Sequence, residues 1–203
     1  WLRREQHYRE SLARQQDEDD LATHLEWLKE FPVKEMIAKG WISGFRDKID
    51  QLKEVLRFFA INSPDQWDAA NFSASFRRSN AYQANPASVA AWLRAGELAA
   101  QDIYCQRFNA ETFREALTQA RRLTVEEPEV FVPRLQEICG DAGVAVVFIP
   151  ELKKTRASGA TRWLTSEKAL IQLSLRYKTN DHFWFTFFHE AGHILLHGKR
   201  EVF

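Results

Sequence analysis

The spacing of apolar residues changes near Thr124, and this change constrains the fold more than any other feature of the sequence. Before it, apolar residues recur at helical spacing, and start signals such as Asn85-Pro86 and Asn109 open the helical segments. After it come three short runs that are rich in β-branched residues or alternate between apolar and polar residues. These strand-like runs cover residues 144–149, 158–164 and 168–177.

The order of these segments predicts an α+β fold. We expect residues 1–123 to form an all-helical module, beginning with a helix over 1–30 and containing a polar loop over 71–85. Residues 124–203 are predicted to form a second part, in which a small antiparallel or mixed three-stranded sheet is backed by two helices. A helix over 182–197 closes this part.

The helix that precedes the strands has conflicting start signals. Thr124 and Glu127 have the spacing of a capping box, in which each residue satisfies a backbone N–H near the helix start. Pro128 and Pro133 cannot both occupy the first helical position, so we expect a kink or a late start.

Composition excludes several classes of protein. The chain has 203 residues, with 28 Lys and Arg against 28 Asp and Glu, which argues against a surface that attracts nucleic acid or acidic lipid as a whole. The balanced charge does not exclude a local basic patch. No apolar run reaches the roughly 18 residues of a membrane helix. The chain starts at Trp1 without a signal-peptide pattern, so we expect a piece of a longer cytoplasmic protein.

The strongest chemical signal is the run His189-Glu190-Ala191-Gly192-His193. Residues four apart lie on one face of a helix, so the imidazoles of His189 and His193 can bind a single zinc ion. Glu190 is the candidate general base that accepts a proton from a water molecule at this metal. This is the H-E-x-x-H pattern of metallopeptidases. The alternative is a chance match, with both histidines hydrogen-bonded in a core.

The residues around this run are apolar on nearly every side, and we therefore expect a buried helix. His197 lies about 12 Å along the helix from His189, too far for both to bind one zinc, and is either a pocket-edge or a surface residue. Glu201 would reach the metal only if the chain doubled back at Gly198. With only two good ligands, we expect this chain to bind zinc weakly and to be inactive as it stands.

The stretch from Phe185 to His197, FTFFHEAGHILLH, closely resembles the core helix of ImmA/IrrE family metallopeptidases. The resemblance extends back through the strand-like runs to Val144. It is weaker in the N-terminal part, where 31–36 and 40–42 resemble the branch of HigA-like antitoxin regulators.

This resemblance implies a zincin-like core in a zinc-dependent endopeptidase that cleaves a repressor or toxin partner. His189 and His193 would be the zinc ligands and Glu190 the base. The family's third ligand is an acidic residue in a later helix, which we expect beyond Phe203. DNA would be bound through an upstream helix-turn-helix domain that is absent from this chain, and no membrane is involved.

Two other functions stay open. One is a non-catalytic sensor that regulates an attached DNA-binding domain, and the other is an antitoxin in which residues 1–123 mask a toxin. Residues 158–162 form a candidate strand edge for an extended peptide substrate. The basic cluster Lys153, Lys154, Arg156 and Arg162 contacts either an acidic or phosphate-bearing partner or only solvent. Tyr177 is either an oxyanion-stabilising residue or a packed tyrosine.

Overall fold

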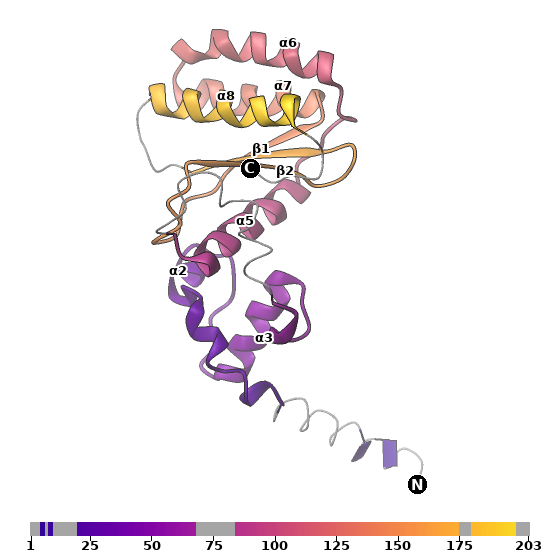
Figure 1. The fold of residues 1–203 in the computed structure, drawn as a ribbon, viewed down its shortest axis with the longest axis vertical. Helices are drawn as coiled ribbons and strands as arrows, with labels where there is room; N and C mark the ends of the chain where they lie inside the picture. The colour runs from indigo at the N-terminus through magenta and orange to yellow at the C-terminus, as the bar shows by residue number, and fades with distance from the viewer. Residues whose placement is uncertain (1–4, 7, 10–19, 68–83, 175–179, 198–203) are drawn as a thin grey trace. The chain divides into compact units, whose positions relative to one another are not determined.

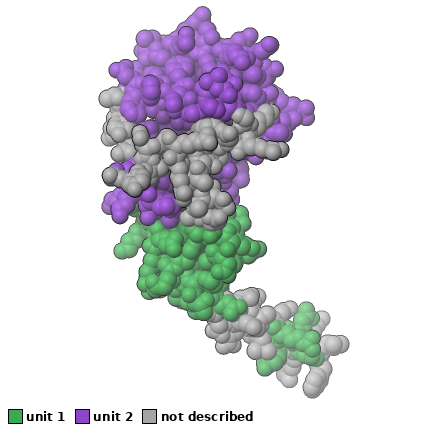
Figure 2. Space-filling view, viewed as in Figure 1, with its two compact units in different colours: residues 1–68 green, residues 69–203 purple. Residues whose placement is uncertain are grey.

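The protein divides into two compact units, Trp1–Asp68 and Ala69–Phe203 (Figure 2). The computed structural model describes residues 5, 6, 8, 9, 20–67, 84–174 and 180–197 (Figure 1). Half of the helix predicted over 1–30, and most of the loop predicted over 71–85, lies outside these residues. The part of 1–30 that is described is not one continuous helix, because 23–26 form turns and Trp27–Glu30 form a 3-10 helix. Each unit is described separately below.

Unit 1 is helical throughout its described residues. Its elements are η1 (Trp27–Glu30), α2 (Val33–Ala38), α3 (Lys48–Phe59) and η2 (Pro64–Gln66). Asp47 caps α3, because its carboxylate accepts hydrogen bonds from the backbone N–H groups of Ile49 and Asp50. Gly40 follows α2 with a φ of 72°, in the left-handed region that glycine adopts without steric cost.

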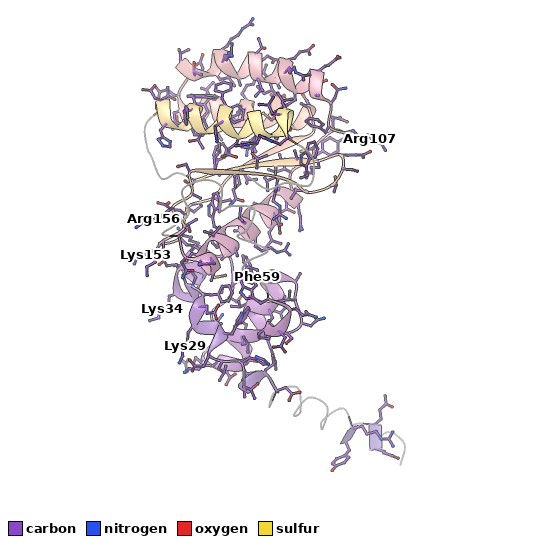
Figure 3. The ribbon with its side chains drawn as sticks, in the orientation of Figure 1. Lys29, Lys34, Phe59, Arg107, Lys153 and Arg156 are labelled. Carbon is purple, nitrogen blue, oxygen red and sulfur yellow. The ribbon has the colours of Figure 1, made fainter. Side chains whose placement is uncertain are left out.

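A cluster of aromatic rings packs beside the core of unit 1, in which Met36, Leu52 and Val55 are fully buried. The centroid of the Phe31 ring lies 4.6 Å from that of Trp27 and 5.2 Å from that of Phe59, which is labelled in Figure 3. The ring of Trp67 lies 4.7 Å from that of Phe59. Edge-to-face contacts of this kind add about 0.5–1.5 kcal/mol per pair to the burial of the rings.

Unit 2 is built around a three-stranded mixed sheet. Its elements are α5 (Pro86–Gln101), α6 (Ala110–Ala120), η4 (Arg121–Val125), α7 (Pro128–Asp141), β1 (Val144–Phe148), β2 (Gly159–Trp163), β3 (Ala169–Leu173) and α8 (Asn180–Leu196). The strand order is β1-β3-β2, with β3 parallel to β1 and antiparallel to β2. The three predicted strands and the mixed sheet are confirmed.

Helices cover both faces of this sheet (Figure 1). α5 packs against one face, on β1 and β3, whereas α7 and α8 pack against the other, and α6 packs on α7. The boundary predicted near residue 124 therefore falls inside unit 2. The physical reason is that both faces of β3 are buried, and α5 covers the face that α7 and α8 leave open.

Side-chain hydrogen bonds fix α5 to the sheet. The buried indole of Trp92 donates to the backbone carbonyl oxygen of Ile149 at 2.9 Å. The side-chain amide of Gln172, on β3, donates to the backbone carbonyl oxygen of Trp92 at 2.7 Å. Gly96 permits this approach, because a Cβ atom there would lie 1.8 Å from Oε1 of Gln172. Lys168 donates to the carbonyl oxygens of Ala100 and of Ile103, at the C-terminal end of α5.

The opposite face of the sheet is covered by apolar packing. Val146, Ile171 and Leu173 point into a cluster of buried residues from α6, α7 and α8. The largest fully buried aromatic side chains of this cluster are Phe113 and Phe187. Phe187 belongs to α8, and its burial holds α8 on β2 and β3 with the histidines that the helix carries.

The start of α7 differs from both sequence expectations. The residues expected to form a capping box lie in or beside a 3-10 helix, Arg121–Val125, and Glu127 precedes α7 without a side-chain capping bond. The helix begins at Pro128, and Pro133 lies inside it. A late start is thus wrong: Pro128 suits the first position, where a backbone N–H has no helical partner.

In the part of the chain that the structure describes, none of the helices combines the length and the apolar character needed to cross a bilayer. Both cysteines are free: Cys139 is buried in the core and Cys105 is half-buried.

Candidate metal centre

α8 has one buried face and one open face. Trp184, Phe187 and Ile194 recur at helical spacing and are at most 5% exposed. On the open face Phe185 is 71% exposed and Leu196 is 80% exposed, with His189 exposed between them. The expectation of a helix buried on all sides is therefore wrong, because the sheet and α7 contact only one side of it.

His189 and His193 lie together on the open face. Their Nε2 atoms are 3.1 Å apart, and their ring planes are nearly perpendicular, at 89°. Two zinc–nitrogen bonds of 2.0–2.1 Å at a tetrahedral angle place the nitrogens about 3.3 Å apart. The observed 3.1 Å is close to this value, and it is equally the distance of a hydrogen bond between the two rings.

The surroundings of His193 favour its neutral, metal-binding form. Its ring is partly buried, and burial is the main cause that lowers its pKa, followed by the neighbouring His189 and His197. A neutral imidazole offers a lone pair to a metal, whereas an imidazolium does not. The ring of Phe185 stacks on the imidazole of His189, with the ring centroids 6.0 Å apart.

Glu190 points away from solvent, between α8 and the edge strand β2. It is 5% exposed, and its Oε2 atom accepts a hydrogen bond from Oγ1 of Thr161 at 2.9 Å. The same hydroxyl lies 3.0 Å from the backbone oxygen of Glu190. Burial raises the pKa of Glu190 to about 7, while the Thr161 bond acts in the opposite direction.

Gly159 makes this close contact between α8 and β2 possible. A Cβ atom at Gly159 would lie 2.8 Å from Cγ of Glu190 and 2.7 Å from Cγ2 of Thr186. Thr161 and Gly159 lie within 158–162, the strand edge predicted for a peptide substrate, but their contact with Glu190 was not predicted. The run 158–164 indicated a strand, but nothing local indicated that its odd-numbered residues face Glu190.

β2 lies at the edge of the described sheet. Ser174 donates its N–H to Ser158 and Leu164 donates to Lys168, so the even-numbered residues of this strand bond with β3. Along an antiparallel pair of strands, residues that hydrogen-bond to the partner strand alternate with residues that do not. The backbone N–H and C=O groups of Gly159, Thr161 and Trp163 therefore point away from β3.

The other candidate ligands do not join the two histidines. Within the described residues no group of three His, Cys, Asp or Glu side chains is placed to hold a metal ion. The ring of His197 is 5.2 Å from that of His193, at the end of α8. Glu201 and Tyr177 lie outside the described residues.

A small cavity lies beside the first turns of α8. It has a volume of about 10 Å³ and is lined by Ser158, Leu173, Ser174, His182, Phe183 and Thr186. Oγ1 of Thr186 is 3.2 Å from Nδ1 of His182 in this wall. The cavity has room for about one water molecule, so it is too small for a peptide side chain.

Comparison of this chain with models of protein families, with curated proteins and with solved structures finds no match.

Proposed function

We propose that this chain is the zinc-dependent endopeptidase domain of a transcriptional regulator of the ImmA/IrrE type, with a zincin-like core. His189 and His193 would bind zinc, and Glu190 would act as the general base. The observation that carries the proposal is the 3.1 Å separation of the two Nε2 atoms, next in sequence to a buried carboxylate.

The chemistry follows from the environment of Glu190. When bound, zinc lowers the pKa of a water molecule toward neutrality and polarises the carbonyl of a scissile peptide bond. Glu190 would accept the proton of that water. In the metal-free chain, burial raises the pKa of this carboxyl group to about 7. Thr161 holds one carboxylate oxygen, so the side chain keeps its orientation when it ionises.

The substrate in this proposal is a protein segment in extended conformation, from a repressor or toxin partner. Its backbone would pair with the outward N–H and C=O groups of Gly159, Thr161 and Trp163. The side chain of Thr161 reaches Glu190 from the same strand. A peptide added to β2 would therefore lie beside the base.

A single isosteric substitution tests the proposal. Glu190→Gln keeps the size and polarity of the side chain but removes the proton acceptor, and we expect at least a ~10²-fold loss of cleavage with zinc still bound. Wild type and variant, each as the complete protein, are incubated with zinc and candidate repressor or toxin proteins, and fragments are followed by mass spectrometry. Glu115→Gln, on the exposed surface of α6, is the matched control and should cleave as wild type does.

Two results would contradict the proposal. Equal cleavage by wild type and Glu190→Gln would remove Glu190 from its role. Zinc binding without cleavage by either protein, across the candidate partners, would instead favour the non-catalytic sensor.

A further inference from the structure

The chain segment between α5 and α6 is fastened to the C-terminal end of α7. The backbone N–H of Gln106 donates to the carbonyl oxygen of Gly140 at 2.9 Å. That of Asn109 donates to the carbonyl oxygen of Ala142 at 3.2 Å. Gly140 permits this approach, because a Cβ atom there would lie 3.3 Å from the carbonyl oxygen of Tyr104. The segment therefore lies directly against the end of α7.

This contact places the two cysteines of the chain close to one another. Cys105 lies between Tyr104 and Gln106 in sequence, and Cys139 directly precedes Gly140. Cys105 is half-buried, whereas Cys139, on α7, is fully buried. A charge on Cys105 raises the pKa of Cys139, so the two side chains are near enough to interact electrostatically. The fold thus holds two free thiols side by side.

Further contacts hold the segment that carries Cys105. The backbone N–H of Phe108 donates to the carbonyl oxygen of Glu167 at 2.8 Å. Arg107, which Figure 3 labels, pairs with the carboxylate of Glu167 at 3.3 Å. A Cβ atom at Gly143 would lie 2.3 Å from Cα of Phe108, so the segment also packs tightly against the turn before β1. The two cysteines cannot move apart without breaking these contacts.

The two thiols differ in how readily they react. Burial raises the pKa of Cys139 to about 12, so this side chain is a neutral thiol at neutral pH. Burial also raises the pKa of Cys105, but the ammonium group of Lys168 acts in the opposite direction. Lys168 is held there by the carbonyl oxygens of Ala100 and Ile103. Because the thiolate is the reactive form, an oxidant reacts first with Cys105, which is also the more exposed.

We propose that Cys105 and Cys139 form a reversible disulfide bond when the protein is exposed to hydrogen peroxide. The sulfur of Cys105 attacks one peroxide oxygen, and the other leaves with the thiol proton as water, which makes Cys105 a sulfenic acid. The sulfur of Cys139 then attacks that of Cys105, gives up its proton and expels a second water molecule. Two thiols and one peroxide thus yield one disulfide and two water molecules. A dithiol reductant restores both thiols and is itself oxidised to a disulfide.

The bond would connect the helices that cover opposite faces of the sheet. It joins the segment that follows α5, on one face, to the end of α7, on the other. The loop that it closes spans residues 106–138, and a disulfide across a loop of this length restricts the unfolded chain. We expect the melting temperature of the oxidised protein to exceed that of the reduced protein by about 5–10 °C.

Peptide mapping of the oxidised protein tests the proposal. The 203-residue protein is treated with hydrogen peroxide in EDTA, its remaining free thiols are alkylated, and it is digested with trypsin without reduction. Trypsin separates the two cysteines into peptides 95–107 and 135–153. We expect these peptides to be joined, two hydrogen atoms lighter than their sum, from a protein that stays a single chain on non-reducing electrophoresis. Reduction with dithiothreitol should separate them.

Single-cysteine variants distinguish the two roles, with circular dichroism to verify folding. Cys105→Ser leaves the buried thiol, and we expect no joined peptides and little oxidation of Cys139. Cys139→Ala leaves the accessible thiol, and we expect a sulfenic acid at Cys105 that dimedone traps. Tyr104→Phe, at the exposed residue beside Cys105, is the control and should form the disulfide as wild type does.

Three results would overturn the proposal. These are oxidation of Cys105 to a sulfinic acid in wild type while Cys139 stays a free thiol, a disulfide that only links two chains, and an oxidised protein that melts no higher than the reduced one. The proposal does not rest on the proposed function, because neither zinc nor a substrate enters the experiment. Failure of either is therefore distinguishable from failure of the other.

Discussion

The two faces of the sheet in unit 2 use polar side chains in opposite ways. On the α5 face, Trp92, Gln172 and Lys168 donate hydrogen bonds to backbone carbonyl oxygens, and these contacts hold the helix in place. On the α8 face the packing is largely apolar, and the buried polar residues are Thr161, Thr186 and Glu190. Burial raises the pKa of Glu190 to about 7. The first arrangement stabilises the fold, whereas the second keeps an acid in an environment that disfavours its charge.

This difference separates structural from functional polar groups. A neutral donor that pairs with a backbone carbonyl costs little to bury. A buried carboxylate costs stability once it ionises, and such groups concentrate at functional sites. Substitutions on the α5 face should therefore destabilise the protein, whereas removing the charge at Glu190 should stabilise it.

The largest effect is expected for Trp92→Ala. The side chain is fully buried between α5 and the sheet, so its removal leaves a cavity and an unpaired carbonyl oxygen on Ile149. We expect a loss of about 3–5 kcal/mol in the free energy of unfolding, measured by urea denaturation. Phe185→Ala, on the open face of α8, should change it by less than about 1 kcal/mol. Similar losses for both variants would contradict the assigned burial.

Glu190→Gln should stabilise the metal-free protein in a pH-dependent way. The pKa of Glu190 rises from 4.5 to about 7 on folding, so between these values the folded state binds more protons than the unfolded state. Stability should therefore fall as pH rises through this window. Above pH 7 the variant should exceed wild type by up to about 3 kcal/mol, and below pH 4.5 the gain should vanish.

Thermal unfolding in EDTA at several pH values measures this difference. Glu115→Gln, which changes the same groups on an exposed helix surface, controls for the loss of one charge. A constant gap between wild type and Glu190→Gln across the window would show that burial does not shift this carboxyl group.

A smaller loss of stability is expected for Gly159→Ala. The added methyl group would overlap Thr186 and Glu190, so α8 must move away from β2. We expect about 1–3 kcal/mol of destabilisation, with a loss of cleavage because Thr161 no longer holds the carboxylate. Gly192→Ala, on α8, is the control, since a methyl group there meets nothing within 4 Å. Wild-type stability in Gly159→Ala would contradict the tight contact.

Much of the secondary structure of unit 2 could be predicted from local patterns. Alternation identified β3, and the start signals at Asn85 and Asn109 are confirmed, since both side chains cap their helices. The place of α5 could not be predicted, because Gln172 reaches it across 80 residues of sequence. The change of periodicity near Thr124 indicated a boundary, whereas the residues on both sides of it belong to unit 2.

The candidate site was predictable only along α8. His189, Glu190 and His193 are neighbours in sequence, so helical spacing alone relates them. Thr161 lies 29 residues from Glu190, and only the pairing of β2 with β3 brings the two together. The exposure of Phe185 was not predicted either. Apolar residues lie on nearly every side of this helix, so the sequence does not show which side is buried.

Zinc titration of the metal-free protein tests the central claim that His189 and His193 form a metal site. Wild type, His189→Ala, His193→Ala and two control variants, His182→Ala and His197→Ala, are compared by calorimetry, with circular dichroism to verify folding. We expect weak binding by wild type and by both controls. Loss of a residue that only hydrogen-bonds to a metal ligand lowers metal affinity by ~10–100-fold. Removal of either ligand itself should lower the zinc affinity by at least that much. Zinc binding that survives both ligand substitutions, or that His182→Ala or His197→Ala abolishes, would contradict the site.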